Sequence, residues 1–228
     1  MTRTAEEMRE AVLDARRDAE VSSAPRRAYG SARTLTVRAM RAAPRVVLSQ
    51  AHLEQLFGAG HRLTVASPGL LGEPLHLERV TLSAGPRREV KVRVCASPSP
   101  VTRIHLPQSA LTTLDIRNAP ARGHGEGAGV ALSGPKGALV IPDGVFRAGV
   151  RLVLPVGVAR KLGVAENTVA EVSLPASGET LDPALYVEVR PNVVESWLVL
   201  DSPHWERIMD PTAPVVVRLG PPSAPPGS

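Results

Sequence analysis

Short hydrophobic runs, alternating or continuous, follow one another along the chain and are separated by turn-forming residues. Strict alternation is typical of half-buried β-strands, and short apolar runs bounded by Gly and Pro are typical of buried ones. The runs that predict strands are TLTVRAM, RVVL, LERVTL, EVKVRV, TRIHL, GVAL, GALVI, RLVLPVG, TVAEVSL, ALYVEV and SWLVLD. Turns at SPG, AGPRR and SPSP separate some of them, and QSALTTLDI has a helical pattern. The pattern predicts a mainly β fold with short helices.

Two stretches of the chain have nearly the same pattern. RVVLSQAHLEQLFG begins at Arg45, and RLVLPVGVARKLGV begins at Arg151. In both, a short apolar strand runs into a helix-like segment with a Leu in the same place, Leu56 and Leu162. Further along, EVKVRV is followed by TRIHL, and LYVEVR is followed by SWLVL at a similar spacing. The repetition predicts an internal duplication, with two similar small β-barrels related by a pseudo-twofold axis.

The repeat and the turn signals divide the chain into five parts. Residues 1–34 are expected to form an N-terminal helix and a flexible linker, and residues 35–118 the first β-barrel. A Gly-rich linker, 119–125, leads to the second barrel at 126–213. Residues 214–228 are expected to hold a strand end and a disordered Pro-rich tail. Because ligand sites are often found where two domains meet, we expect any site at the junction of the halves.

The N-terminal segment 4–21 has the features of an amphipathic helix. Thr4 is a suitable N-cap, and Glu7 three residues later completes a capping box. The hydrophobic stripe is narrow and consists mostly of Ala, so this helix is marginal on its own. A helix of this kind beside a flexible linker is a candidate for docking onto a protein partner.

Composition narrows the class of protein. Of 228 residues, 43% are hydrophobic but only 3% are aromatic, so the core must consist of Val, Leu and Ala. The net charge of +5 permits binding of an anionic ligand, although a solvated Arg-rich surface is the favoured explanation. Scarce aromatic residues argue against nucleic-acid binding. The single Cys95 excludes an internal disulfide. With no segment long enough to cross a membrane and no signal sequence, we expect a cytoplasmic protein.

Several motifs resemble one known family. These are LSQAHLEQLFGAG, ERVTL, NAPAR, GPKG and the paired openings at Arg45 and Arg151, spread between Arg45 and Asp201. In this order and spacing they resemble the phosphate propanoyltransferases, the phosphotransacylases of bacterial microcompartments. The resemblance implies two β-barrels with two zinc ions between them. In the family these ions orient phosphate and acyl-CoA so that the acyl group passes from one to the other.

The zinc ligands implied by the resemblance are missing from this sequence. A His-x-His pair opens each half in the family, whereas this chain has Arg and Val in those places. The positions that the resemblance assigns to ligands are Arg45, Val47, His105, Arg151, Val153 and Val199. Val has no lone pair and Arg has no acceptor, so only His105 could bind a metal. An active-site arginine of the family falls near Ser99. We therefore expect no metal, no cofactor and no catalytic residue here.

The two arginines that replace histidines are the best candidates for a binding site. If the pseudo-twofold axis holds, Arg45 and Arg151 point toward the same cleft, where two guanidiniums could hold a phosphate, a carboxylate or CoA. Arg122, which matches an arginine of the family, and His105 are expected to join them. The alternative is that each arginine reaches the surface or pairs with an acidic residue.

That alternative names specific partners. Glu78 and Asp201 are the expected acidic partners of the arginines if no ligand is bound. Val47, Val153 and Val199 are expected to pack in the core, because a polar metal ligand replaced by Val allows dry packing. The segment SGPKG is read as a tight turn, since it lacks the spacing of a phosphate-binding loop.

The sequence supports two hypotheses on function. The first is a non-catalytic relative of the phosphate propanoyltransferases that acts in binding, scaffolding or assembly. Its expected partners are a microcompartment shell or an enzyme, reached through residues 4–21, or a second copy of the chain. The alternative is a metal-independent protein that binds phosphate or acyl-CoA, or a divergent phosphate acyltransferase, with arginines in place of zinc. A third option retains acyl transfer with a relocated metal.

Overall fold

Two β-sheets make up most of the protein. The computed structural model describes residues 26–27, 33–85, 87–120, 128–166, 168–173, 180–206 and 214–219. The strands are β1 Arg26–Arg27, β2 Arg33–Arg41, β3 Arg45–Val47, β4 Val65–Ser67, β5 Leu75–Ser83, β6 Glu89–Cys95, β7 Arg103–Leu106, β8 Ala128–Ser133, β9 Ala138–Arg147, β10 Arg151–Pro155, β11 Thr168–Ser173, β12 Thr180–Arg190, β13 Trp197–Leu200 and β14 Val215–Leu219. The helices are α2 Gln50–Phe57, α3 Gln108–Leu114, α4 Val156–Leu162 and α5 Ser202–Trp205. The mainly β fold expected from the sequence is confirmed.

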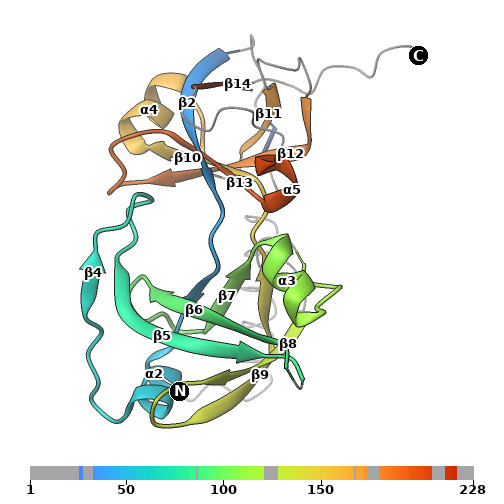
Figure 1. Cartoon of the computed structure of the whole chain (residues 1–228). Helices are drawn as coiled ribbons and strands as arrows, with labels where there is room; N and C mark the ends of the chain where they lie inside the picture. Colours follow the sequence, from blue (N-terminus) through green and yellow to red (C-terminus); the bar gives the residue numbers. More distant parts are fainter. Residues whose placement is uncertain are drawn as a thin grey trace, which may run out of the picture.

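Each sheet closes on itself. One has the strand order β4-β5-β6-β3-β7-β9-β8, and a further pairing of β5 with β8 joins six of its strands into a ring. The other has the order β1-β11-β12-β10-β13-β2-β14, and β11 pairs with β14 in the same way. We call these rings the first and the second barrel. They form two lobes, one above the other in Figure 1, and the long strand β2 runs from the upper lobe toward the lower.

The two halves of the chain repeat one order of elements. From β2 to β8 it is strand, strand, helix, hairpin, strand, helix, strand, and the same order runs from β9 to β14 when the extra strand β4 is set aside. The pairings repeat as well, because β3 lies parallel to β6 and antiparallel to β7, as β10 does with β12 and β13. This repetition agrees with the predicted duplication, whose evolutionary origin stays a prediction.

The barrels exchange their first strands. Strand β2 pairs with β13 and β14 in the second barrel, and β9 pairs with β7 and β8 in the first. Neither barrel is therefore one contiguous segment, in contrast to the expected ranges 35–118 and 126–213. Hydrophobic alternation predicts where strands lie, but it does not say which distant strands will pair.

Each barrel has its own aliphatic interior, and a smaller cluster lies apart from both. The first interior includes Leu82 and Leu132, the second includes Leu152 and Leu198, and all four are fully buried. Ala42 after β2 and Ala148 after β9, in the two segments that cross between the barrels, belong to this third cluster. Its members are Ala42, Ala148, Val153, Val193, Trp197 and Val199.

Both crossing segments are fixed by the same kind of hydrogen bond. The backbone N–H of Ala42 donates to the carbonyl of Leu200 at 2.7 Å. The N–H of Ala148 donates to the carbonyl of Leu106 at 2.8 Å. Each bond ties the chain, as it leaves one barrel, to the end of a strand. These bonds fix where β3 and β10, the strands that follow, begin.

The helices predicted after Arg45 and Arg151 are present. Ser49 caps α2 by accepting from the N–H of His52 at 3.3 Å, and Leu53 and Leu56 are its buried residues. Helix α4 ends at Gly163, whose φ of 58° is left-handed. Both helices follow directly on short strands, as the repeated pattern predicts.

The segment SGPKG is a tight turn, as expected. The N–H of Gly134 donates to the carbonyl of Gly137 at 2.9 Å, and the N–H of Lys136 donates to the carbonyl of Leu56 at 3.0 Å. A Cβ on Gly134 would lie 2.5 Å from the oxygen of Leu56, so only glycine fits against the end of α2. The turn anchors the β8–β9 hairpin to that helix.

Some predictions fall on parts of the chain that the structure does not describe. The helix at 4–21, most of the linker 119–125 with Arg122, and the tail beyond residue 219 lie outside the described residues. These predictions stay predictions. Among the helices that are described, none is long and apolar enough to pass through a bilayer.

Candidate functional site

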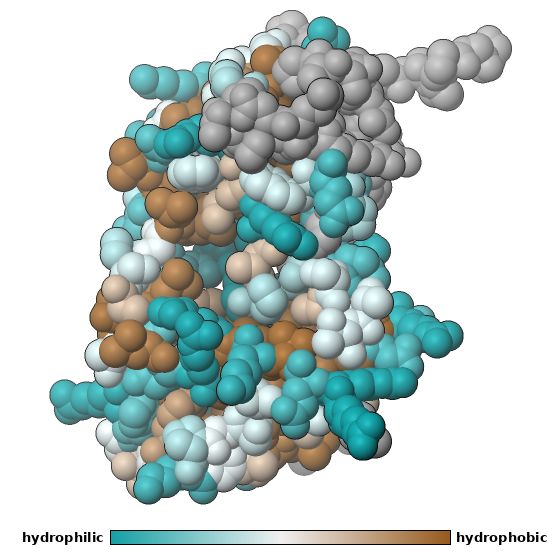
Figure 2. Space-filling view, viewed as in Figure 1, coloured by the Kyte–Doolittle hydropathy of each residue, from teal (hydrophilic) through white to brown (hydrophobic). Residues whose placement is uncertain are grey.

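Arg45 and Arg151 line one cavity between the barrels. Each is the first residue of its strand, β3 or β10, directly after a crossing segment. The cavity has a volume of about 170 Å³, and we call it the interbarrel cavity. Its lining residues are Met40, Arg41, Ala43, Pro44, Arg45, Gly69, Leu70, Leu71, Glu73, Leu75, Cys95, Arg151 and Val199. The surface is hollowed where the two lobes meet, with hydrophobic side chains on both sides (Figure 2).

Arg45 is held by a carboxylate from a loop. Its Nη1 donates to Oε2 of Glu73 at 2.8 Å, and the two side chains are 17% and 21% exposed. Glu73 lies between β4 and β5, in a turn that includes Gly69. Gly69 has a φ of +70°, and a Cβ there would lie 2.1 Å from the backbone oxygen of Glu73. A glycine is therefore needed for this loop to place the carboxylate beside Arg45.

Arg151 is held by a carboxylate from the neighbouring strand. Its Nε lies 3.6 Å from Oε2 of Glu188 on β12, and both side chains are less than a tenth exposed. The distance is that of an ion pair rather than a hydrogen bond. Burial lowers the pKa of Arg151 to about 10, with Arg45 acting in the same direction and Glu188 and Glu73 against it. Arg151 nevertheless remains charged at neutral pH.

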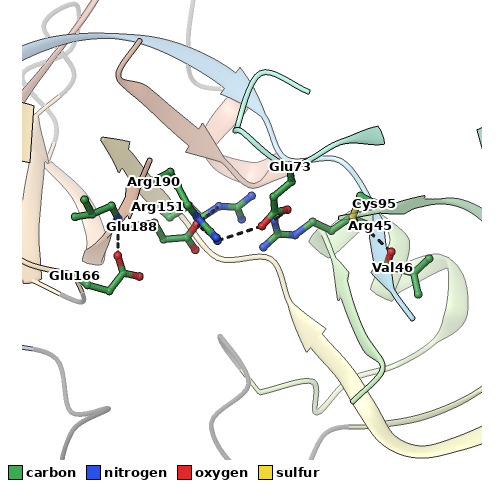
Figure 3. Close-up of polar contacts among 9 residues, drawn as sticks. Arg45, Val46, Glu73, Cys95, Arg151, Glu166, Glu188 and Arg190 are labelled. Atoms are coloured by element: carbon green, nitrogen blue, oxygen red, sulfur yellow. Dashed lines mark hydrogen bonds and ion pairs between the residues drawn. The ribbon is translucent and has the colours of Figure 1, made fainter. Parts of the chain in front are cut away.

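Arg190 joins the two ion pairs. Its Nη2 lies 3.2 Å from Oε1 of Glu73 and 3.2 Å from Oε2 of Glu188. Burial on its own would lower the pKa of Arg190, but the two carboxylates outweigh it and raise that pKa. Figure 3 shows Glu73 between Arg190 on one side and Arg45 on the other. The five side chains alternate in charge, and we call them the arginine–glutamate network.

The network links the two barrels across their junction. Arg45 and Glu73 belong to the first barrel and its β4–β5 loop, whereas Arg151, Glu188 and Arg190 belong to strands of the second. Three guanidiniums face two carboxylates, so one positive charge is not balanced within the network. Such charges away from water are stable only when they are paired closely. The junction is thus both a contact between barrels and a positively charged wall.

His105 lies beside the network but adds no charge to it. It is directly opposite Arg45 in the antiparallel pairing of β3 with β7, so the two side chains share one face of the sheet. Its ring centroid is 5.9 Å from that of Phe146. Burial, with Arg45 and Arg151, lowers the pKa of His105 to about 3. The imidazole is neutral at physiological pH and can offer a hydrogen bond but not an ion pair.

The side chains present do not fit the zinc ions that the resemblance implies. Arg45 and Arg151 offer donors only, and Val153 and Val199 are buried hydrocarbon. Nowhere in the described part of the chain do three His, Cys, Asp or Glu side chains come together as a metal-binding group. The expected core packing of Val153 and Val199 is confirmed, whereas Val47 is only half-buried. The difference arises because β10 is buried along its length and β3 has one buried residue.

The acidic partners expected for the arginines were not the right ones. Glu78 accepts from the N–H of Thr64 and lies 3.0 Å from Nε2 of His61. Asp201 accepts from the N–H of Gln108 at 2.8 Å, which fixes the start of α3. The arginines pair instead with Glu73 in a loop and with Glu188 on a neighbouring strand. The sequence pattern does not indicate either partner.

Two other sequence-derived positions contribute less to the junction. Ser99, where the family arginine falls, hydrogen-bonds through its hydroxyl to the carbonyl of Val101 and is not among the cavity-lining residues. Arg122 lies outside the described residues. The predicted set therefore comes together in part, with Arg45 and Arg151 on one cavity and His105 next to it.

Sequence reasoning missed Glu73, Glu188 and Arg190. For two of them a signal exists, because Glu188 and Arg190 interrupt the apolar strand ALYVEVR and lie two residues apart, on one face of the sheet. Their side chains are in fact 3.2 Å apart. Glu73 carries no such signal, since a single acid in a Gly-containing loop is common on protein surfaces.

The fold is that of a two-barrel protein whose barrels exchange a strand and meet at a charged cavity, the candidate site. The family model for phosphate propanoyltransferase matches residues 41–199, and the chain belongs to that family. The match includes every member of the arginine–glutamate network. A search of curated proteins finds no match to this chain.

Proposed function

We propose that this chain is a member of the phosphate propanoyltransferase family that acts by binding and does not carry out zinc-dependent acyl transfer. One observation carries the proposal. Where the resemblance expects metal ligands, Arg45 and Arg151 belong to a network of alternating arginines and glutamates. A guanidinium repels a metal cation and cannot coordinate it, so the network and a zinc pair exclude each other.

An assay of acyl transfer tests this proposal directly. Purified protein is mixed with propionyl-CoA and phosphate, with and without added zinc, and the release of free CoA is followed. We expect no turnover above the buffer rate in either case, and no stoichiometric zinc by elemental analysis. Zinc-dependent turnover would overturn the proposal and establish the third option, a relocated metal.

A variant that restores the histidines is the positive control for the same experiment. Arg45→His, Val47→His, Arg151→His and Val153→His together rebuild the paired openings of the family. If the frame of the two barrels is kept, this variant binds zinc more tightly than the native chain does. A variant that folds without gaining zinc affinity would show that the positions have been assigned incorrectly.

A metal-independent anion-binding role is the second candidate, and a specific observation favours it. Nε of Arg45 and Nε of Arg151 are buried and have no hydrogen-bond acceptor within the described structure. Buried donors of this kind normally have a partner. Thermal stabilisation by phosphate, CoA or an acyl phosphate that is lost in the double variant Arg45→Ala, Arg151→Ala supports this role.

The proposed partner is reached through residues 4–21. This part of the proposal is supported by the capping pattern and by the amphipathic stripe, and association with a microcompartment in the cytoplasm is proposed with it. Comparing proteins that co-purify with the full chain and with a chain lacking residues 1–30 tests it. Loss of a shell protein or an enzyme on truncation supports docking, and an unchanged set of proteins contradicts it.

A further inference from the structure

We propose that the interbarrel cavity binds an aliphatic monocarboxylate of around six carbons, with its carboxylate on Arg45 and Arg151 and its chain against the apolar lining. This deepens the anion-binding candidate and rests on the proposed binding function. The positive charge of the junction, the two arginines that line the cavity, the composition of the cavity wall and its size each support it.

The charge at the junction favours an anion. The arginine–glutamate network has one guanidinium more than it has carboxylates, and Arg41 also lines the cavity. The most deeply buried cation of the network, Arg151, is 6% exposed, so solvent compensates little of its charge. An anion bound in the cavity would offset this positive charge.

Two cations of the network, Arg45 and Arg151, line the same cavity. A carboxylate has two oxygens with several lone pairs and can accept from two guanidiniums at once. It can therefore bridge the two arginines while each keeps the ion pair with its own glutamate.

Apart from its charged residues, the cavity wall is largely apolar. Its hydrocarbon side chains include Leu70, Leu71, Leu75, Met40 and Val199. A fully polar anion would leave this apolar surface in contact with water, whereas an alkyl chain would cover it, at about 0.8 kcal/mol for each buried methylene. The wall thus selects for an anion with an apolar body.

The size of the cavity limits the length of that body. Its volume is about 170 Å³. An engineered apolar cavity of about 150 Å³ takes up benzene, which has six carbons. A ligand of similar carbon count fits within this volume, which is too small to enclose the pantetheine and nucleotide of CoA.

Calorimetric titration with a series of carboxylates tests the proposal. Acetate, butyrate, hexanoate and decanoate are titrated at pH 7.5 and constant ionic strength, and inorganic phosphate and CoA in parallel. Up to hexanoate, we expect the affinity to rise by up to about fourfold for each added methylene, and then to stop rising. Binding that does not depend on chain length, tighter binding of phosphate or CoA, or no binding of any carboxylate overturns the proposal.

Three variants locate the site. Arg151→Met keeps the volume of the side chain and removes the charge, and we expect hexanoate to bind at least about tenfold more weakly. Arg45→Met gives a second test with a less buried residue, should Arg151→Met not fold. The matched control is Arg88→Met, whose ion pair with Asp115 is exposed and which does not line the cavity. Equal losses in Arg45→Met and Arg88→Met would show a non-specific charge effect.

A further variant tests the apolar wall separately from the charge. Ala43 lines the cavity and is exposed, so Ala43→Leu narrows the space without disturbing a core. We expect weaker binding of hexanoate and unchanged binding of acetate; equal effects on both would contradict the placement of the chain. If no carboxylate binds and acyl transfer is also absent, this inference fails while the proposed loss of catalysis stands. Zinc-dependent turnover would make the proposed function fail instead.

Discussion

Strands β3 and β10 hold the same place in the two barrels, yet their arginines are held differently. Opposite Arg45 in the antiparallel partner strand is His105, and opposite Arg151 is Val199. Each arginine is also paired with a residue of a parallel strand. Two residues further along that strand, the first barrel has Cys95 and the second barrel has Glu188. The second barrel therefore supplies a carboxylate from its own sheet, and the first barrel does not.

The first barrel takes its carboxylate from a loop instead. Glu73 reaches Arg45 from the β4–β5 connection and holds Arg190 of the second barrel at the same time. One acid thus replaces the missing strand residue and also joins the barrels. The comparison shows that a repeated backbone frame does not impose repeated side-chain chemistry, and that the asymmetry creates the link between the halves.

The largest effect is expected where a buried charge loses its nearest partner. Glu188→Gln leaves Arg151 in the interior with its next carboxylate further away, and we expect a loss of about 3–5 kcal/mol in the free energy of unfolding. Denaturant unfolding measures it. Glu73→Gln should cost less, because Glu73 is more exposed and Arg190 keeps Glu188. The asymmetry between the barrels would be contradicted if the two losses were equal.

A control for this comparison lies on the surface. Glu195 pairs with Arg38 at 3.5 Å, and both side chains are more than half exposed. Glu195→Gln removes the same kind of charge with a change of at most about 0.5 kcal/mol. A large loss in this variant would mean that total charge, rather than burial of the network, decides stability.

One added methyl group is expected to disrupt the loop that positions Glu73. Gly69→Ala combines a φ of +70° with a Cβ 2.1 Å from the oxygen of Glu73, and we expect a loss of about 3 kcal/mol in the free energy of unfolding. Gly60→Ala is a matched control, because its φ is also +70° but no atom lies within 4 Å. It should cost about 1 kcal/mol. Similar losses in thermal or denaturant unfolding would exclude a specific role of the close contact.

The neutral state of His105 makes stability depend on pH. Its folded pKa of about 3 lies below the ordinary value of 6.5, so the unfolded chain binds the proton more readily. Stability is therefore full above pH 6.5 and falls as the pH decreases toward 3. Between pH 7 and pH 5 the loss is at most about 2 kcal/mol.

Replacing His105 tests that dependence. In His105→Gln this part of the pH dependence disappears. Urea unfolding at pH 7, 6 and 5 compares the two proteins. A variant that loses stability as steeply as the native chain would contradict a depressed pKa for this histidine.

The smallest expected effect concerns Cys95, whose position in the first barrel corresponds to that of Glu188 in the second barrel. Burial raises the pKa of its thiol to about 11, so the reactive thiolate is scarce at neutral pH. We expect iodoacetamide to leave Cys95 unmodified at pH 8 in the folded protein and to modify it in urea, as measured by mass spectrometry. Rapid labelling without denaturant would show that this side of the junction is open to solvent.

The sequence predicts the elements well and their pairing poorly. The repeated pattern at Arg45 and Arg151 gives the strands, the helices containing Leu56 and Leu162, and the shared cavity. It does not give the exchange of β2 and β9, because strand pairing depends on contacts between distant segments. Nor does it give Glu73, since the close contact at Gly69 that places this acid exists only in three dimensions.

Ion pairs occupy the junction where the resemblance expects zinc. X-ray diffraction from crystals grown with zinc, measured above and below the zinc absorption edge, would locate any metal bound there. We expect no anomalous peak between the barrels, and we expect Nη1 of Arg45 to lie within hydrogen-bond distance of Glu73. A strong anomalous peak next to His105, with the two arginines turned away from the cavity, would contradict this prediction.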